Sequence, residues 1–154
     1  PRRFHTIVTS SAGYPLDRTY YQTIKGMVTP MDILEPGGTI IMVSECSEGL
    51  GSAHFQDAQR RLVALGVEAF AESLSHKELA DIDEWQTEMQ LKPMRVGTIR
   101  LYTTGLDADD LLLTGVEPTA SVEAAVLTSI AEHPGAVAVI PEGPYVIPGY
   151  RPAG

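Results

Sequence analysis

Three polar side chains, Tyr21, Gln22 and Lys25, fall within one short segment that has the pattern of an amphipathic helix. Residues three and four positions apart on a helix are neighbours, so a phenol, an amide and an ammonium group can share one stripe. Together they could hold a small carboxylate through neutral and charge-assisted hydrogen bonds. The alternative is a solvated helix face with an exposed lysine, which is the usual environment of such residues.

The same segment needs a buried face to fix its position. Apolar residues at helical spacing predict a helix from about Arg18 to Val28, with Asp17 as its N-cap. The core stripe of this helix consists of Tyr20, Ile24, Met27 and Val28. A β-branched run over His5–Thr9 precedes it and predicts a strand, and residues 10–15 form the intervening loop.

Strands and helices are predicted to alternate along the rest of the chain. The other predicted strands are 39–44, 98–102 and 136–140, and the other predicted helical segments are 29–35, 52–65, 67–74, 83–91, 107–113 and 120–132. Pro93 is expected to end the helix over 83–91, because proline disrupts helix interiors.

This alternation predicts an α/β fold, with a mostly parallel, Rossmann-like sheet of about four strands and helices on both faces. We expect residues 1–140 to form one domain and the proline- and glycine-rich residues 141–154 to form a tail packed on its surface. Ligands of such sheets bind outside the carboxyl ends of the strands.

Other candidate sites have weaker patterns. The loop Gly49–Ser52 follows a strand and opens a helix, as phosphate-binding loops do, but the third glycine of the dinucleotide motif is replaced by His54. A tight turn is the simpler use of this loop, although a free-standing nucleotide- or phosphate-binding module remains an alternative function. Cys46 has acidic neighbours, which favours a structural role. The four histidines have no metal-ligand spacing, so no metal site is expected.

Composition narrows the class of protein. The 154 residues are 44% hydrophobic and 20% charged, with a net charge of −9, which argues against partners such as nucleic acid or an anionic membrane. A single cysteine excludes an internal disulfide. With no apolar run long enough to span a membrane and no signal peptide before the first strand, the expected location is the cytoplasm.

Several motifs resemble those of a known protein family. The run Tyr14-Pro15-Leu16-Asp17, followed by residues 21–26 (Tyr-Gln-Thr-Ile-Lys-Gly), resembles the start of the C-terminal domain of the nickel-dependent lactate racemase family. Four later stretches agree with this resemblance: residues 38–41, residues 44–52, the helix that carries Trp85, and the closing segment 141–144.

The resemblance implies an isomerase, a racemase or epimerase of lactate or a related 2-hydroxy acid, which acts by hydride abstraction and return on a nickel-pincer nucleotide. It implies that the covalently bound cofactor, the nickel ligand and the catalytic residues belong to an N-terminal domain, so this chain alone is expected to be inactive.

The resemblance assigns substrate binding to Tyr21, Gln22 and Lys25, in a cleft between the two domains. It assigns cofactor binding to Trp85, whose pattern alone is as compatible with a core anchor. The expected partners are the N-terminal domain of the same polypeptide, a small 2-hydroxy acid and cofactor-maturation proteins.

Overall fold

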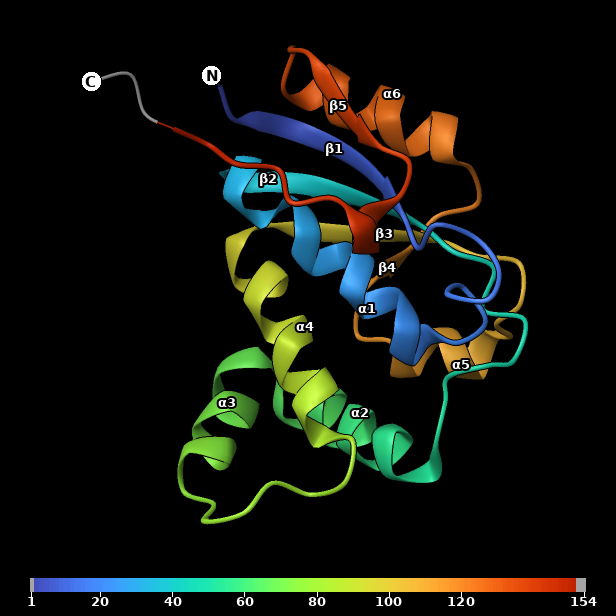
Figure 1. Ribbon diagram of the computed structural model, residues 1–154, viewed down its shortest axis with the longest axis vertical. Helices are drawn as coiled ribbons and strands as arrows, with labels where there is room; N and C mark the ends of the chain where they lie inside the picture. The colour runs from blue at the N-terminus through green and yellow to red at the C-terminus, as the bar shows by residue number, and fades with distance from the viewer. Residues whose placement is uncertain (1, 152–154) are drawn as a thin grey trace.

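The computed structural model describes residues 2–151, which form a five-stranded parallel sheet with six α-helices and two 3₁₀ turns (Figure 1). The α/β class is confirmed. The strands are β1 (Phe4–Ser10), β2 (Leu34–Val43), β3 (Thr98–Tyr102), β4 (Glu117–Pro118) and β5 (Val137–Ile140). The helices are α1 (Tyr20–Val28), α2 (Ala53–Leu65), α3 (Val67–Ser75), α4 (Glu84–Val96), α5 (Ala108–Leu113) and α6 (Val122–Glu132), with 3₁₀ turns η1 (Thr29–Ile33) and η2 (Gly143–Tyr145).

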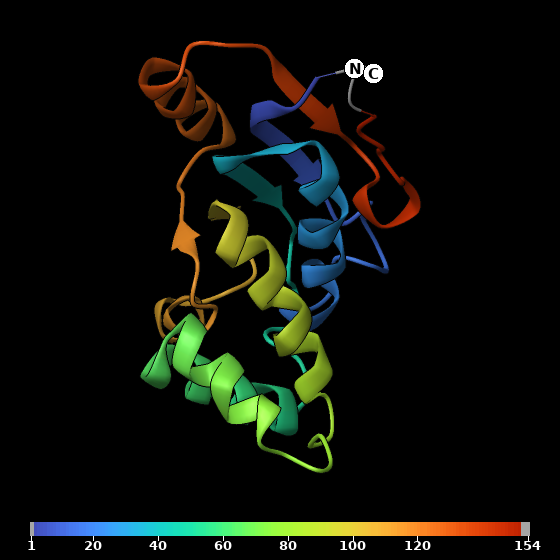
Figure 2. The same ribbon diagram turned by 90° about the vertical axis from the view of Figure 1, so that its left-hand side faces the viewer.

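The strand order is β4-β3-β2-β1-β5. The chain adds β2, β3 and β4 on one side of β1 and then returns through α6 to add β5 on the other side. Right-handed crossovers in opposite directions place their helices on opposite faces of the sheet. Figure 2 shows this arrangement, with α6 on one side of the strands and α1 on the other. The reversal between β1 and β5 is the topological switch point, where sheets of this type bind ligands.

Contacts from β1 confirm the two covered faces. The Thr6 hydroxyl lies 2.6 Å from the Ser129 hydroxyl of α6, and the Thr9 hydroxyl donates to the Gly26 carbonyl of α1 at 3.3 Å. Because both faces are covered, β2 carries consecutive buried apolar residues, Ile40–Met42, with no alternation.

A second layer of helices lies away from the sheet, where α2 and α3 pack against α4 (Figure 1). Its small core consists of Leu62, Phe70 and Leu91. A buried polar chain also joins it to the main body, since the Gln59 amide donates to Gln90 at 3.0 Å and the Gln90 amide donates to the Thr114 carbonyl at 2.7 Å. This layer determines where α4 lies beside α1.

Four local predictions are corrected. Thr19, and not Asp17, caps α1, because the Thr19 hydroxyl accepts from the Gln22 amide, and the helix begins at Tyr20. α4 continues through Pro93 to Val96: the proline removes one backbone donor, but its carbonyl still accepts from the Gly97 amide at 3.1 Å. β2 begins at Leu34, five residues before the predicted start, across an irregular register. The two-residue β4 was not predicted, because it is too short to have a hydrophobic pattern.

The segment after β5 crosses the carboxyl edge of the sheet. The Ser10 hydroxyl donates to the Pro141 carbonyl, and the Thr29 hydroxyl donates to the Gly143 carbonyl at 2.8 Å. Further along, the Arg3 guanidinium lies 4.8 Å from the centre of the Tyr150 ring. The predicted tail ends at Gly154, and its last three residues lie outside the described part of the chain.

Among residues 2–151, no helix has the length and apolarity needed to cross a bilayer.

Gly143 provides a test of this anchoring. A Cβ added to Gly143 would lie 2.5 Å from the Ser10 carbonyl oxygen and 2.7 Å from the Thr9 hydroxyl, whereas a Cβ added to Gly135 would meet nothing within 4 Å. We predict that Gly143→Ala lowers the free energy of unfolding by about 1–3 kcal/mol through overpacking. The matched control, Gly135→Ala, should leave it unchanged or slightly higher. Urea denaturation measures both, and equal stabilities would contradict the close approach.

Candidate functional site

Helix α1 passes directly over the switch point of the sheet. A Cβ added to Gly26 would lie 2.9 Å from the Ser10 carbonyl oxygen at the end of β1, and one added to Gly143 would lie 3.1 Å from the Gly26 Cα. Only glycines permit the backbones of α1, β1 and the segment after β5 to approach so closely. Lys25 therefore lies beside the carboxyl ends of β1 and β5, at the position that the sequence predicted for a ligand site.

Lys25 and Gln22 form a pair on the outer face of α1. The Lys25 Nζ donates to the Gln22 Oε1 at 2.7 Å, and the ammonium is exposed. Within residues 2–151, Lys25 has no ion-pair partner. Because Oε1 already accepts from Lys25, the Gln22 Nε2 group remains a donor. The pair thus presents two adjacent donors, one of them charged, to a ligand.

Tyr21 faces α2 and α4. Its ring makes edge contacts with Phe55, at a centroid distance of 5.2 Å, and with Trp85, at 6.0 Å. Partial burial, together with the nearby Asp83 carboxylate, raises the pKa of the Tyr21 phenol above its ordinary value. The phenol is therefore protonated at neutral pH and can donate a hydrogen bond. The structure joins Tyr21 to Trp85, and Gln22 to Lys25.

Helix α4 presents two consecutive residues to α1. Trp85 is 46% exposed, so it is a surface aromatic residue and not a core anchor. Gln86 is 1% exposed, and its Nε2 donates to the Tyr21 carbonyl at 2.9 Å, which ties the two helices together. The Gln86 Oε1 is buried and has no hydrogen-bond partner among the described residues.

An ionic cluster fixes the start of α4 just before Trp85. The Glu84 side chain is 2% exposed and accepts from Arg61 at 2.6 Å, from Lys77 at 2.7 Å and from the Asp81 amide at 3.0 Å. Burial alone raises the pKa of Glu84, but the hydrogen bonds from Lys77, the Asp81 amide and Arg61 outweigh it, and the pKa is lowered.

An open groove of about 450 Å³ runs along the outer face of α1, between α4 and the segment after β5. Lys25 and Trp85 both line it, together with Gln86, Met89 and residues of the segment 144–148. Tyr21 and Gln22 adjoin it through their contacts with Trp85 and Lys25. Of the four residues predicted for substrate and cofactor binding, two line the groove and each of the other two contacts one of them.

The Gly49–Ser52 loop makes hydrogen bonds to other parts of the chain. The carbonyls of Gly49 and Leu50 accept the first two amides of α1 at 3.0 Å each. The Ser52 hydroxyl, which caps α2, donates to the Asp83 carboxylate at 2.6 Å. A carboxylate thus already lies where a phosphate would bind, so these contacts favour the structural use of the loop. Cys46 is fully buried, which is also compatible with a structural role.

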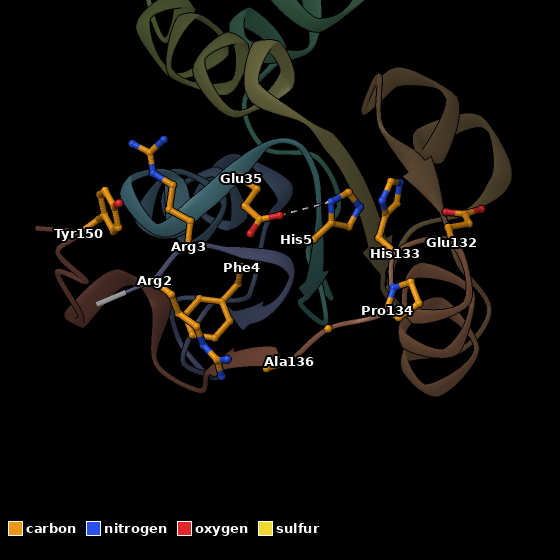
Figure 3. Close-up of a pocket in the computed structure, with 11 residues that line it drawn as sticks. Arg2, Arg3, Phe4, His5, Glu35, Glu132, His133, Pro134, Ala136 and Tyr150 are labelled. Carbon is orange, nitrogen blue, oxygen red and sulfur yellow. Dashed lines mark ion pairs between the residues drawn. The ribbon is translucent and has the colours of Figure 1, made fainter. Parts of the chain in front are cut away.

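A larger cavity, of about 750 Å³, lies between the starts of β1, β2 and β5 and the end of α6 (Figure 3). Figure 3 shows His5 stacked on His133, at a centroid distance of 3.8 Å, with Glu35 4.0 Å from the His5 Nδ1. This cavity is at the amino ends of the strands, opposite the switch point. Within residues 2–151, no group of three histidine, cysteine or acidic side chains could hold a metal ion.

Sequence patterns alone missed part of the groove. Gln86 and Met89 are ordinary helix residues in sequence, and only the packing of α4 on α1 turns them toward Lys25. Val146 and Ile147 follow the last strand, and nothing in their sequence indicated that this segment returns to α1. Their contribution depends on tertiary structure.

Comparisons with known proteins agree with this arrangement. A family model described as the lactate racemase C-terminal domain matches residues 2–147. The chain is 25% identical, over 154 residues, to a lactate racemase from Thermoanaerobacterium thermosaccharolyticum, and the match covers 92% of this chain and 34% of that protein. It is 42% identical, over 48 residues, to a lactate racemase from Lactiplantibacillus plantarum, covering 31% of this chain and 11% of that protein.

The structure of the lactate racemase apoprotein from Thermoanaerobacterium thermosaccharolyticum has the same fold. It matches with a TM-score of 0.83 at 22% identity, covering 95% of this chain and 36% of that chain. The chain therefore spans about a third of the length of this relative.

The ionic cluster around Glu84 predicts a pH-dependent stability. Because the folded-state pKa of Glu84 is lowered, its contribution is fully present above the ordinary value near 4.5 and is lost as the pH falls through the folded-state pKa. We predict that Glu84→Gln lowers the free energy of unfolding by about 1.5–3 kcal/mol at pH 7, and that the difference from the unsubstituted chain shrinks below about pH 4.

Denaturation at a series of pH values measures this difference. Glu88→Gln is the matched control, since Glu88 is exposed on the same helix and forms no ion pair among the described residues. Its effect should stay within about 0.5 kcal/mol. A Glu84→Gln deficit that is the same at pH 7 and pH 3.5 would rule out the carboxylate as its source.

Proposed function

The chain belongs to the lactate racemase C-terminal domain family, and on that premise we propose that it is the substrate-facing part of a racemase or epimerase of 2-hydroxy acids. The observation that carries the proposal is the donor pair of Lys25 and Gln22, exposed beside the switch point of the sheet. The family membership supports the reaction class, and the geometry of the pair supports the binding mode.

The donor pair suits a carboxylate. A carboxylate has two acceptor oxygens, and Lys25 and Gln22 can donate to one each, with the ammonium supplying a charge-assisted bond. Such a contact fixes the position and plane of the carboxylate, and a further contact to the hydroxyl or side chain of the acid would fix its rotation about the bond to the α-carbon. We propose that this orientation determines which substituent of the α-carbon faces the partner domain.

Tyr21 and Trp85 are proposed to form the wall against the cofactor. In this family, a nickel-pincer nucleotide supplies the acceptance and return of a hydride when bound. The described residues fit a role beside that group, because they offer an exposed indole braced by the Tyr21 ring. The protein's part here is to orient the reactants and exclude water.

The remaining machinery is proposed to lie outside this chain. The chain matches about a third of its relative from Thermoanaerobacterium thermosaccharolyticum, and we propose that an upstream domain holds the cofactor and the catalytic acids and bases. Cofactor-maturation proteins would act on that domain. The isolated chain would then bind substrate without turnover.

Substitution of Lys25 in a polypeptide that joins this chain to its upstream domain tests the proposal. We predict that Lys25→Ala reduces kcat/KM for racemisation by about ten- to more than a hundred-fold, because a hydrogen bond to a charged group contributes about 1.5–3 kcal/mol. Loss of optical purity of a single enantiomer measures the rate.

Lys92→Ala is the matched control. Lys92 is an exposed lysine on α4 that does not line the groove, so its removal should leave kcat/KM within about two-fold of the original. If Lys25→Ala and Lys92→Ala have equal, small effects, the proposed carboxylate contact is wrong.

A further inference from the structure

The groove along α1 is apolar over most of its length. Lys25 and Asp32 are its only charged lining residues, and both are exposed. The apolar walls come from α1, η1, α4 and the segment after β5, and include Val28, Met31, Trp85, Met89, Val146 and Ile147. Within the described residues, this is a surface with one anchoring cation and an extended hydrophobic floor.

Two uncharged polar residues, Thr29 and Gln86, also line the groove. The Thr29 hydroxyl already donates to the Gly143 carbonyl, and the Gln86 Oε1 offers one acceptor, which could pair with a single ligand hydroxyl.

A second carboxylate on the ligand would meet Asp32, and the attraction to Lys25 would be offset by that repulsion. Further hydroxyl groups along the ligand would lose water against Val28, Met89 and Ile147 without gaining partners, which costs free energy. The lining therefore favours a ligand with one anionic group and an apolar remainder.

The volume of the groove also favours a ligand with an apolar part larger than a methyl group. Its volume of about 450 Å³ lies within the range of about 300–1,000 Å³ that small-molecule pockets occupy. Lactate, whose side chain is a single methyl group, can engage Lys25 but leaves the hydrophobic walls beyond it uncovered. A longer or aromatic side chain could cover Met89 and Ile147 and displace water from them.

We propose that the preferred substrate of this site is a 2-hydroxy acid with a large apolar side chain, branched aliphatic or aromatic, which lies in the groove while its carboxylate pairs with Lys25. This inference rests on the proposed function, since it assumes that Lys25 holds the carboxylate. Met89 and Ile147 are then specificity-determining residues, one on each side of the groove.

The chain carries its own probe for this proposal. Trp85 is the single tryptophan of the sequence and lines the groove, so its fluorescence reports occupancy without any cofactor. Titrations of the chain with lactate, 2-hydroxy-4-methylpentanoate and 3-phenyllactate should show roughly ten- to hundred-fold tighter binding of the two larger acids, as expected from burial of a leucine- or phenylalanine-sized group. The neutral 3-phenylpropanol should bind at least ten-fold more weakly than 3-phenyllactate.

Two matched variants locate the effect. Ile147 is 96% exposed, so Ile147→Asp removes an apolar wall without disturbing the core, and it should reduce the preference for the larger acids at least five-fold. Leu127→Asp introduces the same charge on exposed α6, on the opposite face, and should leave the preference unchanged.

The outcomes separate this inference from the proposed function. Equal affinities for lactate and the larger acids, a preference that survives Ile147→Asp, or no detectable binding of any acid would each overturn the inference. The proposed function would stand in those cases if Lys25→Ala still impaired racemisation in the complete enzyme, and it would fall if that variant were fully active.

Discussion

The structure depends on the close approach of three backbones at the end of β1. The Ser10 carbonyl is approached by α1 at Gly26 and by the segment after β5 at Gly143, with no room for a side chain at either position. This contact fixes how far α1 extends past the sheet, and it brings residues 144–148 back alongside the helix. The Lys25–Gln22 pair and the wall formed by residues 144–148 follow from it. The opposite wall is carried by α4, which the second layer of helices positions beside α1.

The distribution of charge over the chain determines which ligands the site can attract. The chain has a net charge of −9, and most of its buried or half-buried cations are already neutralised by carboxylates, as Arg61 and Lys77 are by Glu84. Among the described residues, Lys25 has only the Gln22 amide as partner. An unpaired ammonium in an apolar groove on an acidic protein attracts a small anion locally, while the overall charge disfavours polyanions such as nucleic acid. The site is thus suited to a monocarboxylate.

Sequence patterns predicted the parts of the molecule that depend on local periodicity. The α/β class, strand Thr98–Tyr102, the Ser52 cap and the stripe of Tyr20, Ile24 and Met27 were predicted because each is specified by near neighbours in sequence. The assignment of Trp85 to the binding site came only from the family resemblance, and its contact with the Tyr21 ring was not predicted. The groove itself could not be predicted, since Gln86, Met89 and Ile147 meet Lys25 only through tertiary packing. The cap of α1 was misassigned because Asp17 and Thr19 are both good capping residues, two positions apart.

The most direct test of the account is to follow one enantiomer of a 2-hydroxy acid in deuterium oxide with the complete, nickel-cofactor-loaded enzyme that contains this chain. If this chain orients the acid for abstraction and return of a hydride, the acid loses optical purity while its α-carbon acquires no solvent deuterium. Retention of optical purity by a fully loaded enzyme across short, branched and aromatic acids would contradict the account, and so would racemisation accompanied by deuterium at the α-carbon.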